Sequence, residues 1–405
     1  SILDSCGVGH VGSHYLIAGI RPFEVRSFSE DAAWCLAYLD ETVGSEHASI
    51  FTLSYDLGRI LQGINSQHIE SGEPLAHIAR YQSLIIHDYD TGVTMIAGDE
   101  SDSRKMASIL TTGSRHKSAR VTSSSIRSNF SRSDYLKTIE MIKEEIRSGN
   151  TYQTNLTRRV DVDLPHSFSP SAAFARLRAR HPSPFSAFIC RGDSTVVSAS
   201  PERFFKVKNG LISTSPIKGT RPRGSTREED DQLRRELETC TKDRSENTMI
   251  VDLLRNDLGR ICEFGSVEVT SLCEVEEHPS LFHLVSTVEG TLRENARFSD
   301  ILQSLLPCGS ITGAPKISTM KIIDRLERSA RGLSMGAIGY YLPESFGLGE
   351  RTDLSVAIRT MVIQGRRATF NVGGGIVVDS DPAKEWEETV VKSKALLDAL
   401  NTETS

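Results

Sequence analysis

The feature that most restricts the fold is an Asn209-Gly210 dipeptide between two alternating runs, in SASPERFFKVKNGLISTSPIKGT (residues 198–220). A two-residue type I′ turn needs positive φ at both central positions, which Asn and Gly tolerate. The dipeptide therefore predicts a tight β-hairpin in which Lys208 pairs with Leu211.

The same register brings an acid and an amine to one end of a sheet. Counting back from the turn, Glu202 lies opposite Ile217, and Lys218 is the next residue along. We expect Pro216 to form a bulge that redirects Lys218, because proline cannot donate to the ladder. An acid and an amine delivered together predict a functional site.

Lys218 also has a basic setting, since Arg221 and Arg223 follow it in SPIKGTRPRG. A lysine that acts as a nucleophile must first lose its proton, and neighbouring cations and desolvation favour the neutral amine. An ordinary basic surface loop is the alternative interpretation of this segment.

The segment TYQTNLTRRVDVDL (residues 151–164) alternates between apolar and polar positions, which predicts a half-buried strand. Its apolar face contains Tyr152, Leu156, Val160, Val162 and Leu164, and its polar face contains Gln153, Asn155, Asp161 and Asp163.

Two predicted helices each carry a pair of carboxylates at i, i+3 spacing. Asp243 and Glu246 form one pair, and Glu385 and Glu388 form the other, in a helix that Asp381 is expected to cap. Two such pairs facing each other suit Mg²⁺, which prefers oxygen ligands. Acidic residues in a first helical turn also occur simply because they stabilise the helix dipole.

An arginine and a run of glycines complete the candidate residues. The segment TDLSVAIRTMVIQG predicts one alternating strand that places Arg359 opposite Leu354 and Val356, as a clamp for a carboxylate. Gly373, Gly374 and Gly375, inside a second apolar run, predict a ligand lying against backbone N–H groups.

Composition excludes several classes of protein. The chain is 38% hydrophobic and 25% charged, as expected for a soluble globular protein, and its net charge of -6 argues against nucleic acid as a partner. No apolar run approaches the roughly 20 residues of a membrane helix. The first residues show no basic segment before an apolar core, and seven cysteines lack CxxC spacing, so we expect a cytoplasmic location without membrane attachment.

Eight motifs in order resemble the chorismate-utilising enzymes: SPERF, PIKGTRPRG, KDRSENTMIVDLLRNDLGRIC, LFHLVSTVEG, GSITGAPK, GAIGYY, AIRT and GGGIVVDSDPAKEWEET. The resemblance covers residues 131–400, and SYDLGR resembles the N-terminal part of the component I enzymes. It implies an α/β (α+β) fold: one large sandwich of two antiparallel sheets with helices outside. We expect an N-terminal region over 1–125 and a chorismate-binding region over 126–405, forming one compact unit, with a solvated serine-rich connection over 101–133.

Within this family, two positions resemble the aminodeoxychorismate synthases, component I. These enzymes have lysine at the position of Lys218, where anthranilate, isochorismate and salicylate synthases usually have alanine. Gln153 stands where isochorismate and salicylate synthases carry a lysine that activates water, which implies that ammonia is added instead. Anthranilate synthase component I, and a catalytically silent chorismate-binding or glutaminase-docking subunit, are the alternatives.

The resemblance also implies a role for each candidate residue. Mg²⁺ held by carboxylates would bind the ring carboxylate of chorismate, and the arginine and glycines would bind the enolpyruvyl carboxylate. Lys218 would attack C2, Glu202 would protonate the departing 4-hydroxyl, and ammonia would then displace the lysine at C4. The implied metal ligands are Glu246, Glu385 and Glu388, with Asp243 as a helper; the implied substrate-binding residues are Arg359, Gly373, Gly374, Gly375, Tyr340, Thr312 and Gln153.

Two further implications concern His283 and the source of nitrogen. The resemblance places His283 near the ring of the substrate, although a structural hydrogen-bonding role is the alternative. None of the seven cysteines lies in a G-x-C-x-G elbow, so the ammonia is expected from a separate glutamine amidotransferase subunit.

Overall fold

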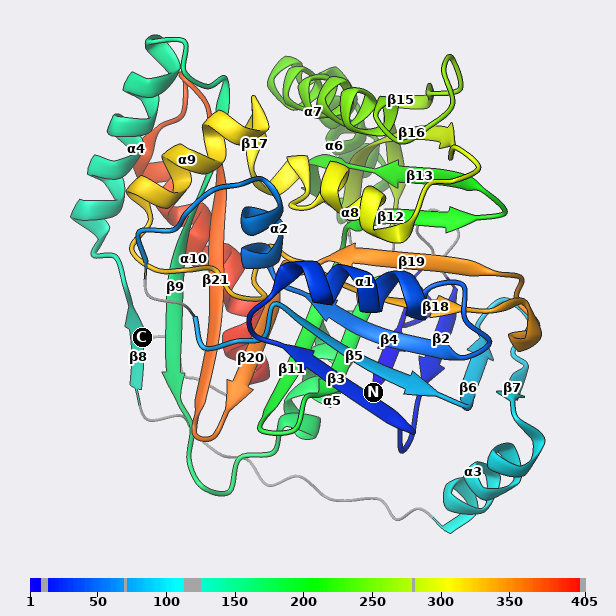
Figure 1. Cartoon of the computed structure of the whole chain (residues 1–405). Coiled ribbons are helices and arrows are strands. Elements are labelled where there is room, and N and C mark those ends of the chain that lie inside the picture. Colours follow the sequence, from blue (N-terminus) through cyan, green and yellow to red (C-terminus); the bar gives the residue numbers. More distant parts are fainter. Residues whose placement is uncertain (9–13, 69–70, 113–124, 279–280, 401–405) are drawn as a thin grey trace.

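The computed structural model describes residues 1–8, 14–68, 71–112, 125–278 and 281–400. Within these residues, two antiparallel sheets pack face to face and helices cover their outer surfaces (Figure 1). This confirms the expected sandwich of two antiparallel sheets with helices outside.

One sheet, called here sheet A, joins eleven strands among the described residues. Its order is β17 (Gly313–Ala314), β9 (Gln153–Asp163), β21 (Arg367–Ile376), β20 (Thr360–Gln364), β11 (Ser194–Ser200), β10 (Phe185–Cys190), β1 (Ile2–Asp4), β2 (Tyr15–Ala18), β6 (Ser83–Asp88) and β7 (Thr94–Gly98), with β8 (Ser125–Ser128) beside β9.

The second sheet, sheet B, joins ten strands of the described chain. Its order is β14 (Ile217–Pro222), β16 (Leu281–Thr291), β13 (Leu211–Ser215), β12 (Arg203–Lys208), β19 (Arg351–Val356), β18 (Ala337–Leu342), β4 (Ala48–Leu53), β5 (Ala76–Tyr81) and β3 (Glu24–Phe28), with β15 (Glu268–Glu277) beside β16. Strands from both sides of the predicted boundary at residue 125 are thus hydrogen-bonded within both sheets.

Apolar side chains between and outside the sheets form the cores. Ile17 and Ile86 of sheet A meet Ile50 and Ile338 of sheet B between the sheets. The helices pack on the outside: α1 (Ala32–Thr42), α2 (Tyr55–Leu61), α7 (Thr241–Gly259) and α8 (Phe298–Leu305) share a core with sheet B, and α5 (Pro170–Arg180) and α10 (Pro382–Ala399) share one with sheet A. In Figure 1, α1 lies in front of β4 and α10 lies behind β21.

The remaining helices lie at the edges of the sandwich. α4 (Arg132–Arg147) and α9 (Lys316–Leu326) pack with α10 around the β9 end of sheet A, and α6 (Arg227–Thr239) packs on β14, β15 and β16. Short 3-10 turns, η1 (Gly309–Ile311) and η2 (Glu344–Phe346), precede β17 and β19. α3 (Glu100–Thr112) occupies the start of the predicted connection, and residues 113–124 of that connection lie outside the described residues. None of the described helices is both long and apolar enough to cross a membrane.

The chain changes from one sheet to the other at several places, and two neighbouring ones are called here the crossings. After β11 it leaves sheet A through Pro201 and Glu202, and after β19 it leaves sheet B through residues 357–359. The prediction of a single strand through Arg359 is therefore wrong. Arg359 has a φ of 47°, a left-handed conformation that interrupts a strand and turns the chain into the other sheet.

A buried ion pair joins the central strands of sheet B. Arg203 on β12 donates from Nε and Nη2 to the two carboxylate oxygens of Asp353 on β19, at 3.0 and 3.1 Å. Both side chains are almost completely buried. Replacing Arg203 with Met should lower the free energy of unfolding by about 3–5 kcal/mol, because it leaves a buried carboxylate without this partner.

Urea unfolding of R203M, of the double variant R203M/D353L and of the surface control R26M tests this expectation. The double variant should recover part of the loss, and R26M should change stability by less than about 1 kcal/mol because Arg26 is half exposed. Equal unfolding midpoints for R203M and R26M would show that the buried pair is unimportant.

Candidate active site

Beside the two crossings lies a cavity of ≈ 560 Å³ between the ends of the sheets, α7 and α10. Eleven of the predicted site residues line it, although they come from seven separate segments of the chain. They are Glu202, Lys218, Asp243, Glu246, His283, Arg359, Gly373, Gly374, Gly375, Glu385 and Glu388.

Glu202 lies on the first crossing, and its side chain is 5% exposed. Burial raises the pKa of this carboxyl group to about 7, against the opposing effects of the Ser310 hydroxyl and the positive charge of Lys218. Among the described residues, Oε1 of Glu202 has no hydrogen-bond partner. A protonated carboxyl group facing a cavity can serve as a general acid near neutral pH.

The predicted hairpin is present, but its register changes before the crossing. Asn209 and Gly210 have φ of 52° and 75°, and Lys208 pairs with Leu211, which confirms the type I′ turn. A bulge between Arg203 and Lys206 shifts the register, so Glu202 does not continue the ladder opposite Ile217. The expected bulge at Pro216 is wrong.

After Pro216 the chain starts β14, which pairs with β16 and carries Lys218 to the cavity. Its register shifts between Ile217 and Thr220, where Gly219 has a φ of 80°. Lys218 and Glu202 thus reach one cavity from neighbouring strand ends rather than from one continuous hairpin.

The two arginines expected to act on Lys218 are engaged by carboxylates. Arg221 donates to Asp243 at 3.1 Å, and Arg223 donates to Asp230 and lies over the ring of Phe282. The expected concentration of positive charge around Lys218 is therefore wrong. Because the carboxylate of Asp243 accepts this hydrogen bond from Arg221, it is less available to bind a metal ion.

Three glutamates line the cavity from two helices, Glu246 on α7 and Glu385 and Glu388 on α10. Burial raises the pKa of Glu246 and of Glu385, and the negative charge of Glu388 raises both further. Lys242 lies 3.8 Å from Glu246, and Lys392 lies 2.5 Å from Glu388.

In the part of the chain that the structure describes, no three His, Cys, Asp or Glu side chains converge closely enough to form a metal site. The two lysine pairs and the Ser380 hydroxyl, which donates to Glu385 at 2.7 Å, hold the glutamates in this arrangement. The donor chemistry nevertheless fits a hard divalent cation, because three carboxylates face one cavity and Oε1 of Glu246 has no hydrogen-bond partner among the described residues.

The glycines of β21 keep the cavity open beside these carboxylates. A Cβ at Gly374 would lie 3.1 Å from Oε2 of Glu385, and a Cβ at Gly375 would lie 2.5 Å from Nε2 of Gln153. Gln153 is fully buried behind Gly375, and neither polar atom of its side chain has a hydrogen-bond partner among the described residues. A buried amide group without hydrogen-bond partners destabilises the folded state, unless a ligand supplies the missing partners.

Two predicted residues lie elsewhere. Tyr340 is on the face of β18 that packs between the sheets, and it lines a separate small cavity with Tyr15 and Asp353. Thr312 is fully buried and donates its hydroxyl to the carbonyl groups of Cys308 and Gly309, so it satisfies its own turn. The structure therefore does not place these two residues among those that line the candidate cavity.

His283 lies on β16 at the edge of the cavity, and its side chain is mostly buried. Its Nδ1 is 3.0 Å from the hydroxyl of Thr220 on the neighbouring strand. This contact fixes the ring, and it is compatible with both the catalytic and the structural interpretation.

Several cavity residues were missed from the sequence. Lys392 follows Glu388 by one helical turn and donates to the carbonyl of Gly373 at 3.0 Å. Its i, i+4 spacing from Glu388 was the available signal. Asn155 and Asn371 line the cavity from β9 and β21. Asn155 was recognised as polar, but nothing in its strand marked it as part of a site.

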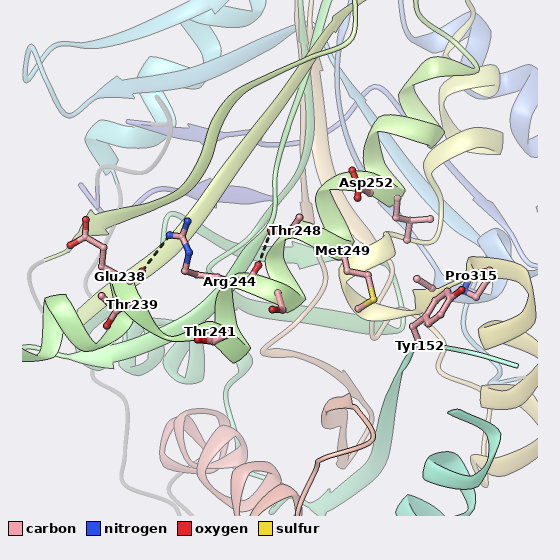
Figure 2. Close-up of a pocket in the computed structure, with 12 residues that line it drawn as sticks. Tyr152, Glu238, Thr239, Thr241, Arg244, Thr248, Met249, Asp252 and Pro315 are labelled. Carbon is pink, nitrogen blue, oxygen red and sulfur yellow. Dashed lines mark hydrogen bonds between the residues drawn. The ribbon is translucent and has the colours of Figure 1, made fainter. Parts of the chain in front are cut away.

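A larger groove of ≈ 1100 Å³ lies between α7 and β17. Figure 2 shows Arg244, Thr248 and Met249 of α7 on one side of it, with Tyr152 and Pro315 on the other. None of the described residues that line it is a predicted site residue. The smaller cavity is the better candidate because the acid, the amine and the glutamates converge there.

Three known proteins show extensive similarity to this chain. It is 44% identical over 308 residues to an aminodeoxychorismate synthase of Streptomyces griseus, covering 76% of this chain but 40% of that protein. It is 33% identical over 418 residues to an anthranilate synthase component 1 of Haloarcula marismortui, covering 95% and 84%. The crystal structure of anthranilate synthase component I from Streptococcus pneumoniae TIGR4 superposes with a TM-score of 0.84 at 28% identity, covering 96% and 93%.

Residues 22–398 match the family described as chorismate binding enzyme. This match includes both crossings and every segment that lines the cavity. The chain is therefore a member of the chorismate-binding enzyme family, within the group that contains the aminodeoxychorismate and anthranilate synthases.

Proposed function

We propose that this chain acts as an aminodeoxychorismate synthase, component I, which converts chorismate and ammonia to 4-amino-4-deoxychorismate for the synthesis of para-aminobenzoate and folate. The observation that carries the proposal is that Lys218 and Glu202 line one cavity. Anthranilate synthase component I is the second candidate, favoured by the structural similarity to the Streptococcus pneumoniae protein. Anthranilate synthases usually have alanine at the position that corresponds to Lys218, and an alanine side chain could form no covalent intermediate.

The proposed reaction has two displacements. The neutral amine of Lys218 attacks C2 of chorismate, both conjugated ring double bonds shift toward C4, and the 4-hydroxyl leaves as water after taking a proton from Glu202. The ammonium of the adduct returns a proton to Glu202. Ammonia then attacks C4, both double bonds return, and the amine of Lys218 leaves with a proton given up by the new amino group. The net change replaces a hydroxyl group with an amino group, with one water as the second product.

Substrate binding is assigned to the groups around the glycines. Arg359 is partly buried and would bind the enolpyruvyl carboxylate with bidentate geometry, together with backbone N–H groups of residues 373–375. Burial lowers the pKa of the Arg359 guanidinium, because the charged form lacks solvent until an anion binds. The unpaired amide of Gln153 would orient the incoming ammonia.

Mg²⁺ would be held by Glu246, Glu385 and Glu388, and when bound it would supply positive charge to the ring carboxylate. Asp243 would then serve as a helper after release from Arg221. The lysines now paired with two of these glutamates, Lys242 and Lys392, would become available to the substrate.

The nitrogen is proposed to come from a separate glutamine amidotransferase that supplies ammonia, since none of the seven cysteines lies in a glutaminase elbow. The chain is proposed to act in the cytoplasm, with chorismate as its small-molecule partner and without nucleic acid or membrane.

A covalent adduct is the first expected outcome. Incubation with chorismate and Mg²⁺ but without ammonia should add the mass of chorismate less one water to the chain, at Lys218. Adding ammonium should release 4-amino-4-deoxychorismate and restore the original mass. Intact-protein mass spectrometry and product analysis measure both steps, with Lys218→Ala as the control that forms no adduct. Production of anthranilate without an adduct would identify the second candidate, and no turnover at all would indicate a silent subunit.

The pH dependence follows from Glu202. Because its raised pKa of about 7 keeps the proton on this group up to neutral pH, the acid is available below pH 7 and is lost as the pH rises through 7. The rate of adduct formation should therefore fall above pH 7. In Glu202→Gln it should be roughly 10²-fold slower or more and show no break near pH 7. An unchanged break in that variant would assign the titration to another group.

The metal assignment predicts a loss of affinity that can be measured without turnover. Glu246→Gln and Glu388→Gln should each weaken Mg²⁺ binding by about tenfold or more, because each removes a charged oxygen ligand. Isothermal titration calorimetry with MgCl₂ measures this, and Glu387→Gln is the matched control because Glu387 is exposed on the same helix. Equal affinities in all three variants would place the cation elsewhere.

A further inference from the structure

The 3-10 turn η1 brings a hydroxyl group to the proposed general acid. Ser310 of η1 lines the candidate active-site cavity together with Glu202, and its hydroxyl opposes the effect of burial on the carboxyl group of Glu202. A hydroxyl has this effect when it donates a hydrogen bond to the charged carboxylate. The thiol of Cys308 lies 3.3 Å from the same hydroxyl oxygen, and burial raises the pKa of this thiol to about 11. Ser310 therefore lies between a neutral thiol and the acid.

The turn itself is held by a buried arginine from another part of the chain. Arg331 follows α9 and is 4% exposed, and its Nη1 donates to the carbonyl group of Ile311 at 3.0 Å. Its Nη2 donates to the carbonyl group of Asn155 on β9 at 2.8 Å, and Nδ2 of Asn155 donates to the same Ile311 carbonyl at 3.1 Å. One guanidinium group thus joins η1 to sheet A beside the cavity.

Two further groups fix the orientation of this guanidinium. The carboxylate of Glu327 accepts hydrogen bonds from Nε and Nη2 of Arg331, at 3.0 and 2.8 Å, in the bidentate geometry that arginine favours. Glu327 also accepts from the backbone N–H and the hydroxyl of Thr157 on β9. The guanidinium carbon lies 4.5 Å from the centre of the Tyr55 ring on α2. Arg331 therefore cannot move without giving up several contacts.

The contact with Tyr55 gives a role to the motif SYDLGR, which the proposed reaction does not use. The backbone N–H of Tyr55 donates to the carbonyl group of Gly332 at 2.8 Å, and Asp56 accepts from the N–H of Gly332 at 3.0 Å. α2 thus holds both backbone groups of the residue next to Arg331. None of the described residues that line the cavity precedes Asn155, so the N-terminal region acts on the cavity through contacts of this kind.

We propose that Arg331 is a positioning residue for the proposed general acid, because it holds the turn from which the Ser310 hydroxyl donates to Glu202; the proposal rests on the proposed function. This hydrogen bond fixes the orientation of the carboxyl group. Oε1 of Glu202 has no hydrogen-bond partner among the described residues, and it keeps the proton for the departing hydroxyl group. Arg331 is not among the described residues that line the cavity, so its effect on the reaction passes through η1.

The charged and titratable groups around Glu202 come from several elements. Lys218 and Lys392 lower its pKa, as does the backbone N–H of Ile217. Replacing Ser310 by alanine changes no charge, so a shift in the titration of Glu202 reports the loss of the hydroxyl. The groups that share the cavity with Glu202 are Lys218 of β14, His283 of β16, Arg359 of the second crossing, the carboxylates and Lys242 of α7, and the glutamates and Lys392 of α10.

Variants of Ser310 test the last link through the pH dependence of adduct formation with chorismate and Mg²⁺. Ser310→Ala removes a donor that lowers the pKa of Glu202, so this pKa should rise and the carboxyl group should keep its proton to a higher pH. The ratio of the rate at about pH 8 to the rate at about pH 6 should therefore exceed that of the unaltered chain by roughly twofold or more. Ser310→Thr keeps the hydroxyl group and should keep the original ratio.

Variants of Arg331 test whether the arginine acts through this turn. Arg331→Lys keeps the positive charge but cannot make all four hydrogen bonds of the guanidinium. It should slow adduct formation by about tenfold or more and raise the rate ratio as Ser310→Ala does, while Mg²⁺ affinity measured by calorimetry stays within about twofold. Arg351→Lys is the matched control, because Arg351 is 6% exposed and donates to the carbonyl group of Gly349 outside the cavity. It should keep the original rate and ratio.

An unchanged ratio in Ser310→Ala would show that its hydroxyl does not act on Glu202. A lower melting temperature of Arg331→Lys with the original rate and ratio would show a structural role alone, and an equal change in Arg351→Lys would show a general effect of destabilisation. Each of these results would overturn the proposal and leave the proposed function intact.

If Arg331→Lys does not fold, the double variant Glu327→Gln/Arg331→Gln takes its place with the same expectations, because it leaves no unpaired charge. An unaltered chain that forms no adduct with chorismate would contradict the proposed function, and the positioning role with it.

Discussion

The two crossings are joined to each other by backbone hydrogen bonds, and the candidate active-site cavity depends on this contact. The N–H of Val356 donates to the carbonyl of Glu202 at 3.0 Å, and the N–H of Ala199 donates to the carbonyl of Arg359 at 3.1 Å. The residues of each crossing lie between a strand of one sheet and a strand of the other, so their side chains need not pack in the core of either sheet. Glu202 and Arg359 can therefore face the same cavity from segments that are far apart in the sequence.

The cavity balances opposite charges rather than concentrating one sign. Lys242 and Lys392 lie beside two of the glutamates, and Arg221 is paired with Asp243. Burial disfavours any unpaired charge. These internal ion pairs therefore stabilise the charged side chains of the cavity when no ligand is bound. Binding of an anionic substrate with a cation would exchange one set of pairs for another, which costs less than creating charge in an apolar site.

Glu202 differs from these groups because it lies on a crossing rather than on a helix. Burial raises its pKa to about 7, and burial together with the negative charge of Glu388 raises the pKa of Glu246 and of Glu385. The same cavity thus separates one carboxyl group suited to donating a proton from three suited to binding a cation.

Local patterns in the sequence determined the elements: the Asn209-Gly210 turn, the strand β9 and the Asp381 cap of α10 are all present, although both faces of β9 are buried over residues 153–158. Local patterns predict these elements because turn geometry, strand period and helix capping depend on residues that are close in the sequence. Only the tertiary structure decided which side chains share a cavity. A bulge in β12 changed the register of Glu202, a left-handed residue at 359 divided a predicted strand, and the packing between the sheets placed Tyr340 away from the site. These outcomes depend on which strand lies beside which, and that choice is fixed by burial of the whole core rather than by any short stretch of sequence.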